Sequence, residues 1–560
     1  MNADLQRLGD EYWAFILASE PTSASLRGIH DYDADLEDVS RQTEDEHIAT
    51  LDGLASAAEA IDPATLTADE RVSREVLMFE ASTQADGLRS RMAEFAVDPF
   101  HGIQVVYQQL AGQIPIANPE HADAALAKWS KMGLLVDQSI GRLRQGLARD
   151  RTPPVVGASK ALAQVEAYLT SPVESDAFVN LAAPPMWNEI QVAAWRDRLA
   201  SVVTTVVRPA FERYRSAIAN EVMPKARPQE RSGVVWLSDG DEVYARAIRR
   251  HTSLKRTPLA IHRAGLDDIS ALEIEYAALG ITVLDIDDVP TIYERLRTDE
   301  TLRFADADAV VAAAQAAMDR AVTATPRWFG LQPKAPCVMA EMPAVGAEDA
   351  PLAFYLPPAE DGSRPGTYFV NTTAPTTRTR FESEALAFHE SVPGHHLQLT
   401  IAQELADIPD FRRNAFITVF HEGWGLYTER LAEEMGLYSG DLERFGILSF
   451  DSWRAGRLVV DTGIHALGWS RQEAIDYLVA NSPQAENNIV NEVERYIAWP
   501  GQALAYKTGQ REMFAARKHA MAILGDRFDI RRFHDALLGS GSVPMPTMHR
   551  LIGEWIASAT

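Results

Sequence analysis

Apolar residues recur every three or four positions through most of this chain, which is the spacing of amphipathic helices. The pattern fills the first part of the sequence up to about Ala226 and dominates again from Thr379 to the end. Its clearest stretches are Asp123–Leu147, Gln191–Val222, Asp267–Leu279 and Asp306–Val322. The chain is therefore predicted to be mainly α-helical.

A second pattern interrupts the helical one. Short runs of β-branched and aromatic residues, bounded by turn residues, predict strands. These runs are Gly233–Leu237, Val338–Met342, Leu352–Leu356 and Thr367–Val370. The last three predict a small sheet just before the C-terminal helices. Because no linker-like break separates the parts, we expect one continuous structural unit with an N-terminal helical lobe (residues 1–332) and a lobe that contains the sheet (residues 333–560).

Composition narrows the class of protein. The 560 residues carry 53 basic and 79 acidic side chains, a net charge of −26. Nucleic acids and anionic membranes bind positive surfaces, so neither is an expected partner. A single cysteine, Cys337, excludes an internal disulfide framework and a multi-cysteine zinc site. With neither a signal-peptide pattern nor a membrane-spanning apolar run, a cytoplasmic protein is expected. The sequence does not indicate the oligomeric state.

Three histidines and a glutamate fall within eight residues at His389-Glu-Ser-Val-Pro-Gly-His-His396. The nearest familiar pattern is H-E-x-x-H, in which two histidines one helical turn apart hold zinc and the glutamate acts on water. Thr379-Arg-Phe-Glu382 fits a capping box that would start a helix leading into this cluster. Pro393 cannot continue that helix, and Gly394 accepts the dihedral angles of a break.

The break decides which histidine can be the second metal ligand. In an uninterrupted helix, His395 would point in a different direction from His389, and His396 would lie too far from His389 along the helix axis. Neither histidine could then bind the same ion as His389. If Pro393-Gly394 is extruded, His395 takes the second position of H-E-x-x-H, and His396 remains a rival. Glu390 would then lie beside the metal as the general base.

A third ligand is expected from the segment Phe420-His-Glu-Gly-Trp-Gly-Leu-Tyr427. Glu422 lies at the edge of the buried face of this predicted helix, one connection after the histidine cluster. Taken alone, Glu422 is as readily a solvated helix glutamate. Catalytic zinc sites take three protein ligands and keep one position for water. We therefore predict a site for one Zn²⁺ ion, with His389, Glu422 and either His395 or His396 as its ligands.

Another helical segment carries Arg454, Arg457, Asp461 and His465 on adjacent turns. Asp461 and His465 are i,i+4 partners that could hydrogen-bond, which makes His465 a candidate catalytic residue. A structural ion-pair network is the competing interpretation. The two arginines are candidates to bind a carboxylate of the substrate.

Tyrosines and cations gather beside a Pro-Gly break between Glu494 and Lys507. A tyrosine hydroxyl aimed at a developing oxyanion would stabilise a tetrahedral intermediate, and Tyr496 and Tyr506 are the two candidates. Lys507 is a third candidate to bind the carboxylate of a substrate. Spacing alone does not choose among them.

These segments resemble those of a large bacterial family labelled domain of unknown function 885, which is placed among the zincin-like metallopeptidases. The matching signatures are His389-Glu-Ser-Val-Pro-Gly-His-His396, Glu422-Gly-Trp-Gly-Leu-Tyr427, Arg457-Leu-Val-Val-Asp-Thr-Gly-Ile-His465 and Pro500-Gly-Gln-Ala-Leu-Ala-Tyr-Lys507. Tyr12–Ser40 also resembles the opening segment of the family. The resemblance covers nearly the whole chain. It implies a mainly α, two-lobed zincin with a deep active-site cleft beside the small sheet.

A more distant similarity is to angiotensin-converting enzyme and related helical zinc carboxypeptidases. Phe420-His-Glu422 is similar to their ligand segment, and Arg495-Tyr496 to an Arg-Tyr pair whose tyrosine faces the intermediate. Those relatives lack the Pro-Gly insertion, and they carry an aspartate where this chain has Leu426. Support for the metal ligands would therefore come from Glu429 or Asp461.

The predicted function is zinc-dependent hydrolysis of peptide bonds in short peptides, by metal-activated water with Glu390 as the general base. The strand Thr367–Asn371 is expected to pair with the extended substrate as an edge strand, with Asn371 as a substrate contact. Two alternatives stay open. The first is a metal-dependent hydrolase of a non-peptide amide or ester, and the second is an inactive metal-binding scaffold.

Overall fold

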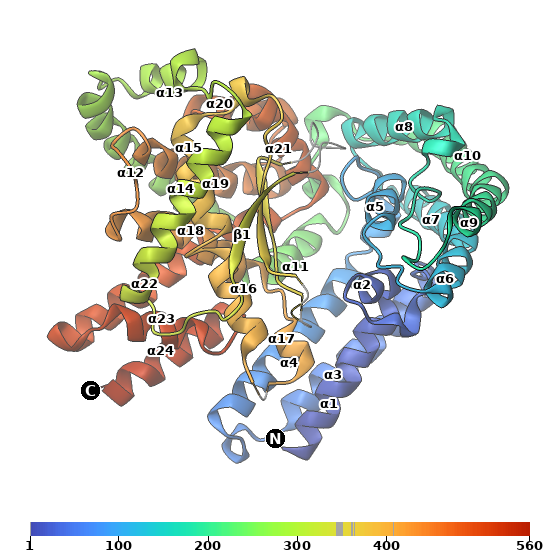
Figure 1. The fold of residues 1–560 in the computed structure, drawn as a ribbon, viewed down its shortest axis with the longest axis horizontal. Coiled ribbons are helices and arrows are strands. Elements are labelled where there is room, and N and C mark those ends of the chain that lie inside the picture. Colours follow the sequence, from blue (N-terminus) through green and yellow to red (C-terminus); the bar gives the residue numbers. More distant parts are fainter. Residues whose placement is uncertain (1, 343–350, 360–361, 363, 407, 560) are drawn as a thin grey trace.

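Helices make up most of the chain, as the periodicity predicts, and one small sheet lies near the middle of the molecule (Figure 1). The computed structural model describes residues 2–342, 351–359, 362, 364–406 and 408–559. Among these residues, no helix combines the length and the apolar character that crossing a membrane requires.

The first four helices begin the chain along the lower part of the molecule in Figure 1. They are α1 (Ala3–Ser19), α2 (Pro21–Leu26), α3 (Arg41–Ala60) and α4 (Ala68–Arg89). Buried residues of α1, α3 and α4 belong to the largest hydrophobic core, which they share with residues 304–556. This core therefore includes residues from both of the predicted lobes.

The buried residues of a second core all lie between positions 97 and 222, and its helices form a separate group at the right of Figure 1. They are α5 (Ile103–Ala111), α6 (Pro119–Ser130), α7 (Met132–Leu147), α8 (Val155–Thr170), α9 (Glu189–Val202) and α10 (Arg208–Ala217). The predicted helix Asp123–Leu147 is divided at Lys131 between α6 and α7. The predicted helix Gln191–Val222 is continuous, with π-helical turns at Val203–Val207 and Ile218–Val222.

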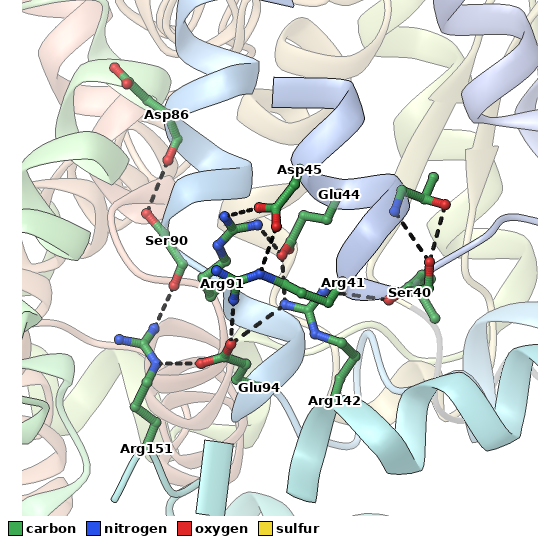
Figure 2. A network of polar contacts seen from close by, with 12 residues as sticks. Ser40, Arg41, Glu44, Asp45, Asp86, Ser90, Arg91, Glu94, Arg142 and Arg151 are labelled. Carbon is green, nitrogen blue, oxygen red and sulfur yellow. Dashed lines mark hydrogen bonds and ion pairs between the residues drawn. The ribbon is translucent and has the colours of Figure 1, made fainter. Parts of the chain in front are cut away.

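Buried charges connect these two parts of the molecule (Figure 2). Arg142 of α7 donates to Glu44 of α3 over 2.7 Å. Glu94, which is fully buried, accepts from Arg41 of α3 over 2.8 Å and pairs with Arg151 over 3.1 Å. A buried ion pair of this kind is costly to break, because removing one partner leaves a charge unpaired. The network thus holds the second group of helices in a fixed place against α3.

The remaining helices surround the sheet and form the larger body at the left of Figure 1. Those before the sheet are α11 (Gly240–Thr252), α12 (Pro258–Leu284), α13 (Val289–Thr298) and α14 (Ala307–Ala324). Those after it are α15 (Arg380–Glu390), α16 (His395–Glu404), α17 (Asp410–Arg413), α18 (Thr418–Glu434), α19 (Arg444–Ala466), α20 (Arg471–Asn481), α21 (Glu486–Ala498), α22 (Ala505–Leu524), α23 (Ile530–Leu538) and α24 (Met545–Ala559).

The three strands predicted before the C-terminal helices are confirmed, as β1 (Cys337–Glu341), β2 (Ala353–Leu356) and β3 (Gly366–Val370). Their order is β1-β3-β2, with β1 parallel and β2 antiparallel to β3. The expectation that Thr367–Asn371 serves as an edge strand is wrong, because β3 is the central strand and both of its edges are already paired. Within the described sheet, the free edges belong to β1 and β2.

The prediction of a strand at Gly233–Leu237 is also wrong. Val234–Trp236 forms a 3₁₀ turn, and the backbone N–H of Val234 donates to the ring of His465 over 3.2 Å. A Cβ atom at Gly233 would lie 1.8 Å from the carbonyl oxygen of Ile464. This segment is fixed by close contact with α19 instead of by a neighbouring strand.

Candidate metal centre

The helix that carries the histidine cluster breaks where the proline predicts. Helix α15 ends at Glu390, and α16 begins at His395. The indole N–H of Trp424 holds the turn between them, because it lies 3.0 Å from the carbonyl oxygen of Pro393 and 3.2 Å from that of Gly394. A Cβ atom at Gly394 would lie 1.9 Å from the carbonyl oxygen of His389, so this position requires glycine.

The start of α15 differs from its prediction in one respect. The helix begins after Thr379 as expected, but the side chain of Thr379 caps no backbone N–H group, so the capping box is absent. The Thr379 hydroxyl instead donates to the carboxylate of Glu382. Glu382 also accepts from Ser449 and Gln484, and these longer-range contacts draw its carboxylate away from the helix terminus.

Three side chains from separate helical segments converge after the break. The Nε2 atoms of His389 and His395 each lie 3.7 Å from the same carboxylate oxygen of Glu422. The two imidazole rings are 4.7 Å apart and nearly perpendicular. One potential ligand atom from each of the three residues lies within 4.8 Å of the other two. Helices α15, α16 and α18 thus bring two imidazole nitrogens and a carboxylate oxygen to one point.

His389 is held in place from two sides. Its Nδ1 atom donates to the carboxylate of Glu429 over 2.8 Å, which fixes the ring orientation and leaves Nε2 facing Glu422. Gly425 packs against the ring, and a Cβ atom there would lie only 2.6 Å from Nε2 and Cε1 of His389. Of the two residues expected to support the metal ligands, Glu429 and Asp461, the structure brings Glu429 to the cluster.

His396 faces away from this cluster. Its Nδ1 atom hydrogen-bonds the hydroxyl of Tyr355 on β2 over 2.8 Å and lies 3.3 Å from the hydroxyl of Thr400. His396 is 2% exposed, so these contacts hold it in a buried position against the sheet. The structure therefore separates the adjacent histidines, with His395 in the cluster and His396 against the sheet.

The charges within the cluster favour one ionised carboxylate, one charged imidazole and one neutral imidazole. Burial alone would lower the pKa of His389, but hydrogen bonds to Glu422 and Glu429 raise that pKa to about 9. Burial alone would raise the pKa of Glu422, but His389 and then His395 lower that pKa to about 2. Burial, with a smaller contribution from the charge of His389, lowers the pKa of His395 to about 3. His395 is therefore neutral near pH 7, with a lone pair available for a metal ion.

Glu390 follows His389 at the end of α15. Burial raises the pKa of its carboxyl group to about 7, partly offset by the positive charge of His389. The backbone of Tyr355 on the edge strand β2 also faces this carboxyl group and acts to lower the pKa. A carboxyl group with a pKa near neutrality can both take and give a proton at physiological pH.

The two candidate tyrosines lie in different surroundings. Tyr506 is close enough to Glu422 to help lower the pKa of that carboxyl group. The Tyr496 hydroxyl, in contrast, accepts from Arg457 over 2.8 Å and from Trp453 over 3.0 Å, and donates to Glu492 over 2.8 Å. The Tyr496 hydroxyl is thus already engaged by three partners, whereas Tyr506 lies at the cluster.

The three candidate cations also differ. Lys507 donates to the buried carboxylate of Asp451, and Arg457 pairs with Glu492 over 2.9 Å. Arg454 is 6% exposed, and its guanidinium lies 4.4 Å from the ring of Trp453. Its Nε and Nη1 atoms are buried with no hydrogen-bond partner among the described residues. Arg454 is therefore the cation least committed to a protein carboxylate.

His465 has no ring nitrogen free for chemistry. Its Nδ1 atom accepts from the backbone N–H of Val234, and its Nε2 atom donates to the carbonyl oxygen of Tyr496 over 3.0 Å. The expectation of a hydrogen bond between Asp461 and His465 is wrong. Asp461 instead accepts from the Tyr244 hydroxyl and from the backbone N–H of Gly501. Both side chains tie α19 to neighbouring segments.

Asn371 follows β3 and is 1% exposed. Its carboxamide donates to the carbonyl oxygen of Pro351 over 3.2 Å and accepts from the backbone N–H of Thr373 over 3.0 Å. It also belongs to the wall of a cavity of about 430 Å³ that extends from the sheet to α21. Tyr368 and Leu386 line the same cavity, and Leu386 precedes Glu390 by one turn of α15.

The donor set of the cluster fits a zinc ion. Two imidazole nitrogens and one carboxylate oxygen are ligands that zinc takes in catalytic sites. Glu429 forms the carboxylate–histidine contact that commonly orients a ligating imidazole. The Nδ1 atom of His395 is buried with no hydrogen-bond partner among the described residues, so no competing contact turns its ring away. His389, His395 and Glu422 are the residues that would hold the ion.

Comparison with known proteins places the chain in a family. Residues 21–552 match the family described as "Bacterial protein of unknown function (DUF885)". The chain belongs to this family. A search of curated proteins found no match.

Two solved structures share the fold. One is described as a "putative lipoprotein" from Colwellia psychrerythraea, with 25% identity, a TM-score of 0.92 and complete coverage of both chains. The other is described as a "putative lipoprotein of unknown function" from Shewanella oneidensis, with 18% identity and a TM-score of 0.77 over 98% of this chain and 99% of that one. The cytoplasmic location expected from the sequence stays a prediction.

The sequence did not predict the roles that Gly425 and Trp424 have at the site. Gly425 leaves space for the ring of His389, and Trp424 holds the turn at Pro393-Gly394. Both lie in the segment that contains Glu422, where the small residues on either side of Trp424 were the available signal. Which partner a small residue packs against is a tertiary property, so the sequence could not assign it.

Proposed function

We propose that this protein is a zinc-dependent hydrolase of peptide bonds in short peptides, with a two-lobed zincin-like fold and its site in a cleft beside the sheet. The observation that carries the proposal is the convergence of His389 and His395 on one oxygen of Glu422, with Glu429 behind His389. Zinc bound there would activate water and polarise the carbonyl group of the substrate.

The residues of the chain have distinct roles in this proposal. Glu390, which directly follows the ligand His389 at the end of α15, takes the proton from the attacking water and returns it to the leaving amine. Tyr506 donates to the developing oxyanion, because its phenol lies at Glu422. Arg454 attracts negative charge on the substrate, since its buried Nε and Nη1 atoms have no hydrogen-bond partner among the described residues.

The edge strand β2 supports a peptide over another acyl substrate. Tyr355 pairs with Tyr368 of β3 on one side, and its backbone faces Glu390. An extended peptide can add to such an edge through main-chain hydrogen bonds, which a small amide or ester cannot do. In this proposal β2 takes the role that the sequence had suggested for β3.

Hydrolysis of a panel of tri- to hexapeptides, measured beside small amides and esters, tests the proposal. Chelation should abolish peptide cleavage, and added zinc should restore it. Glu390→Gln should keep stoichiometric zinc and lose at least about 100-fold in kcat, because general acid–base catalysis contributes this much. Glu166→Gln, an exposed change on α8, is the matched control and should keep full activity.

Each contrary result points to a different alternative. Cleavage of small amides or esters without peptides would favour a non-peptide hydrolase. Stoichiometric zinc with no hydrolysis of any compound would favour an inactive scaffold. Full activity of Glu390→Gln would remove Glu390 as the base.

A further inference from the structure

The cavity that extends from the sheet to α21 has a cationic wall within an acidic protein. Arg303, Arg378 and Glu382 are the charged residues among the described side chains that line it. Glu382 already accepts hydrogen bonds from Thr379, Ser449 and Gln484. The wall thus carries one net positive charge, although the whole chain carries −26.

Neither arginine of this wall has a carboxylate partner among the described residues. Arg378 donates from Nε to the carbonyl oxygen of Thr373 over 3.2 Å. Arg303 donates to the carbonyl oxygens of Thr377 and Arg297. Burial lowers the pKa of Arg378, with no acidic group to offset the effect. Backbone contacts thus position both guanidinium groups and leave their charge uncompensated.

The cavity is suited to an extended polar ligand. Its volume of about 430 Å³ is within the range of sites that hold small molecules. On the side opposite the sheet, Asn487, Asn488 and Asn491 line it from one face of α21. Their carboxamides can donate to and accept from the main chain of a peptide. The cavity therefore combines groups for peptide backbone with groups for an anion.

Helix α15 gives the distance between this wall and Glu390. Arg378 precedes the helix by two residues, and Leu386, one turn before Glu390, lines the cavity. At 1.5 Å per residue, α15 rises about 15 Å from Arg380 to Glu390, and Arg378 and Thr379 before it are extended instead of helical. The long arginine side chain covers part of this distance. The remainder corresponds to roughly three residues of extended peptide at about 3.3 Å each.

We propose that this cavity is a carboxylate-recognition site in which Arg378, supported by Arg303, binds an anionic group of the substrate about three residues from the bond that is cut. The inference rests on the proposed peptidase function, and it makes the protein selective for oligopeptides that carry a carboxylate at this position. The carboxylate is either the C-terminus of the peptide or an acidic side chain.

Binding of peptides to the Glu390→Gln protein tests this inference without turnover. Three fluorescent hexapeptides are compared by anisotropy: one with a free C-terminus, one with a C-terminal amide, and one amide that ends in glutamate. The free acid, the glutamate peptide or both should bind at least about tenfold tighter than the plain amide, as a charge-assisted hydrogen bond allows. Comparison of the two anionic peptides tells a terminal carboxylate from a side-chain carboxylate.

In the Glu390→Gln protein, a second substitution Arg378→Gln should abolish the preference for anionic peptides. Arg378→Lys should keep part of this preference because the positive charge remains. Arg380→Gln is the matched control, since Arg380 is exposed and does not line the cavity. Circular dichroism checks that each variant is folded. Equal binding of all three peptides, or a preference that survives in Arg378→Gln, would overturn the inference. Absence of hydrolysis by the wild type would refute the proposed peptidase, whereas the binding comparison would still test the cavity.

Discussion

Replacing Gly425 with alanine tests whether the space beside His389 serves metal binding. The new Cβ atom would lie 2.6 Å from both Nε2 and Cε1 of His389, whereas ordinary contacts of such atoms are 3.4–4 Å. The ring must therefore move by about 1 Å or the helices must separate. The ring of His389 cannot move freely away from the new Cβ atom. Its Nδ1 atom hydrogen-bonds Glu429 over 2.8 Å, and the residue is only 3% exposed.

A displacement of this size exceeds what zinc coordination tolerates. Zinc–nitrogen distances are about 2.0–2.1 Å, and a sound site keeps them within about 0.2 Å. Disturbing groups that orient a ligating histidine costs about 10–100-fold in metal affinity. We expect at least this loss for Gly425→Ala, since here the ligand itself is moved.

Competition with a chromophoric chelator measures the zinc affinity of the variant. Gly53→Ala is the control, because Gly53 lies in α3 and a Cβ atom there would contact nothing within 4 Å. That control should keep its zinc affinity and gain up to about 1 kcal/mol of stability from the helix preference of alanine. An unchanged zinc affinity in folded Gly425→Ala would show that zinc binding does not need the space beside His389.

Three further predictions concern histidines and their partners. His395→Ala should lose stoichiometric zinc in equilibrium dialysis and His396→Ala should retain it; equal loss would contradict the assignment. Glu429→Gln should weaken zinc binding about 10–100-fold, as measured by the same chelator competition, and unchanged affinity would argue against its orienting role. Burial lowers the pKa of His465 on α19 to about 4 and that of His534 on α23 to about 3, so both are neutral when folded near pH 7. Their folded pKa values lie below the unfolded value of about 6.5, so unfolding takes up protons, and the melting temperature should fall as the pH drops from about 6.5 toward 4; a flat profile would contradict this.

Local patterns were sufficient to predict the helices, the three strands and the break at Pro393-Gly394. Each depends on neighbours in the sequence, because periodicity and the missing N–H of proline act within one or two helical turns. The grouping of His389 with Glu422 was also accessible, since both lie on short segments with strong signals.

The features that escaped prediction depend on contacts between distant segments. Strand order places β3 between two partners, and nothing within Thr367–Val370 shows this. The direction of His396 is set by Tyr355 on β2, which is 41 residues away in the sequence. His465 resembles a catalytic histidine in its spacing from Asp461, but Val234 and Tyr496 occupy its two nitrogens.

Anomalous diffraction at the zinc edge, from crystals of the zinc-loaded protein, tests the metal centre most directly. We expect one ion at about 2.0–2.2 Å from Nε2 of His389, Nε2 of His395 and a carboxylate oxygen of Glu422. His396 should remain on Tyr355. An ion bound to His396, or no ion between His389, His395 and Glu422 at saturating zinc, would contradict this assignment of the metal ligands.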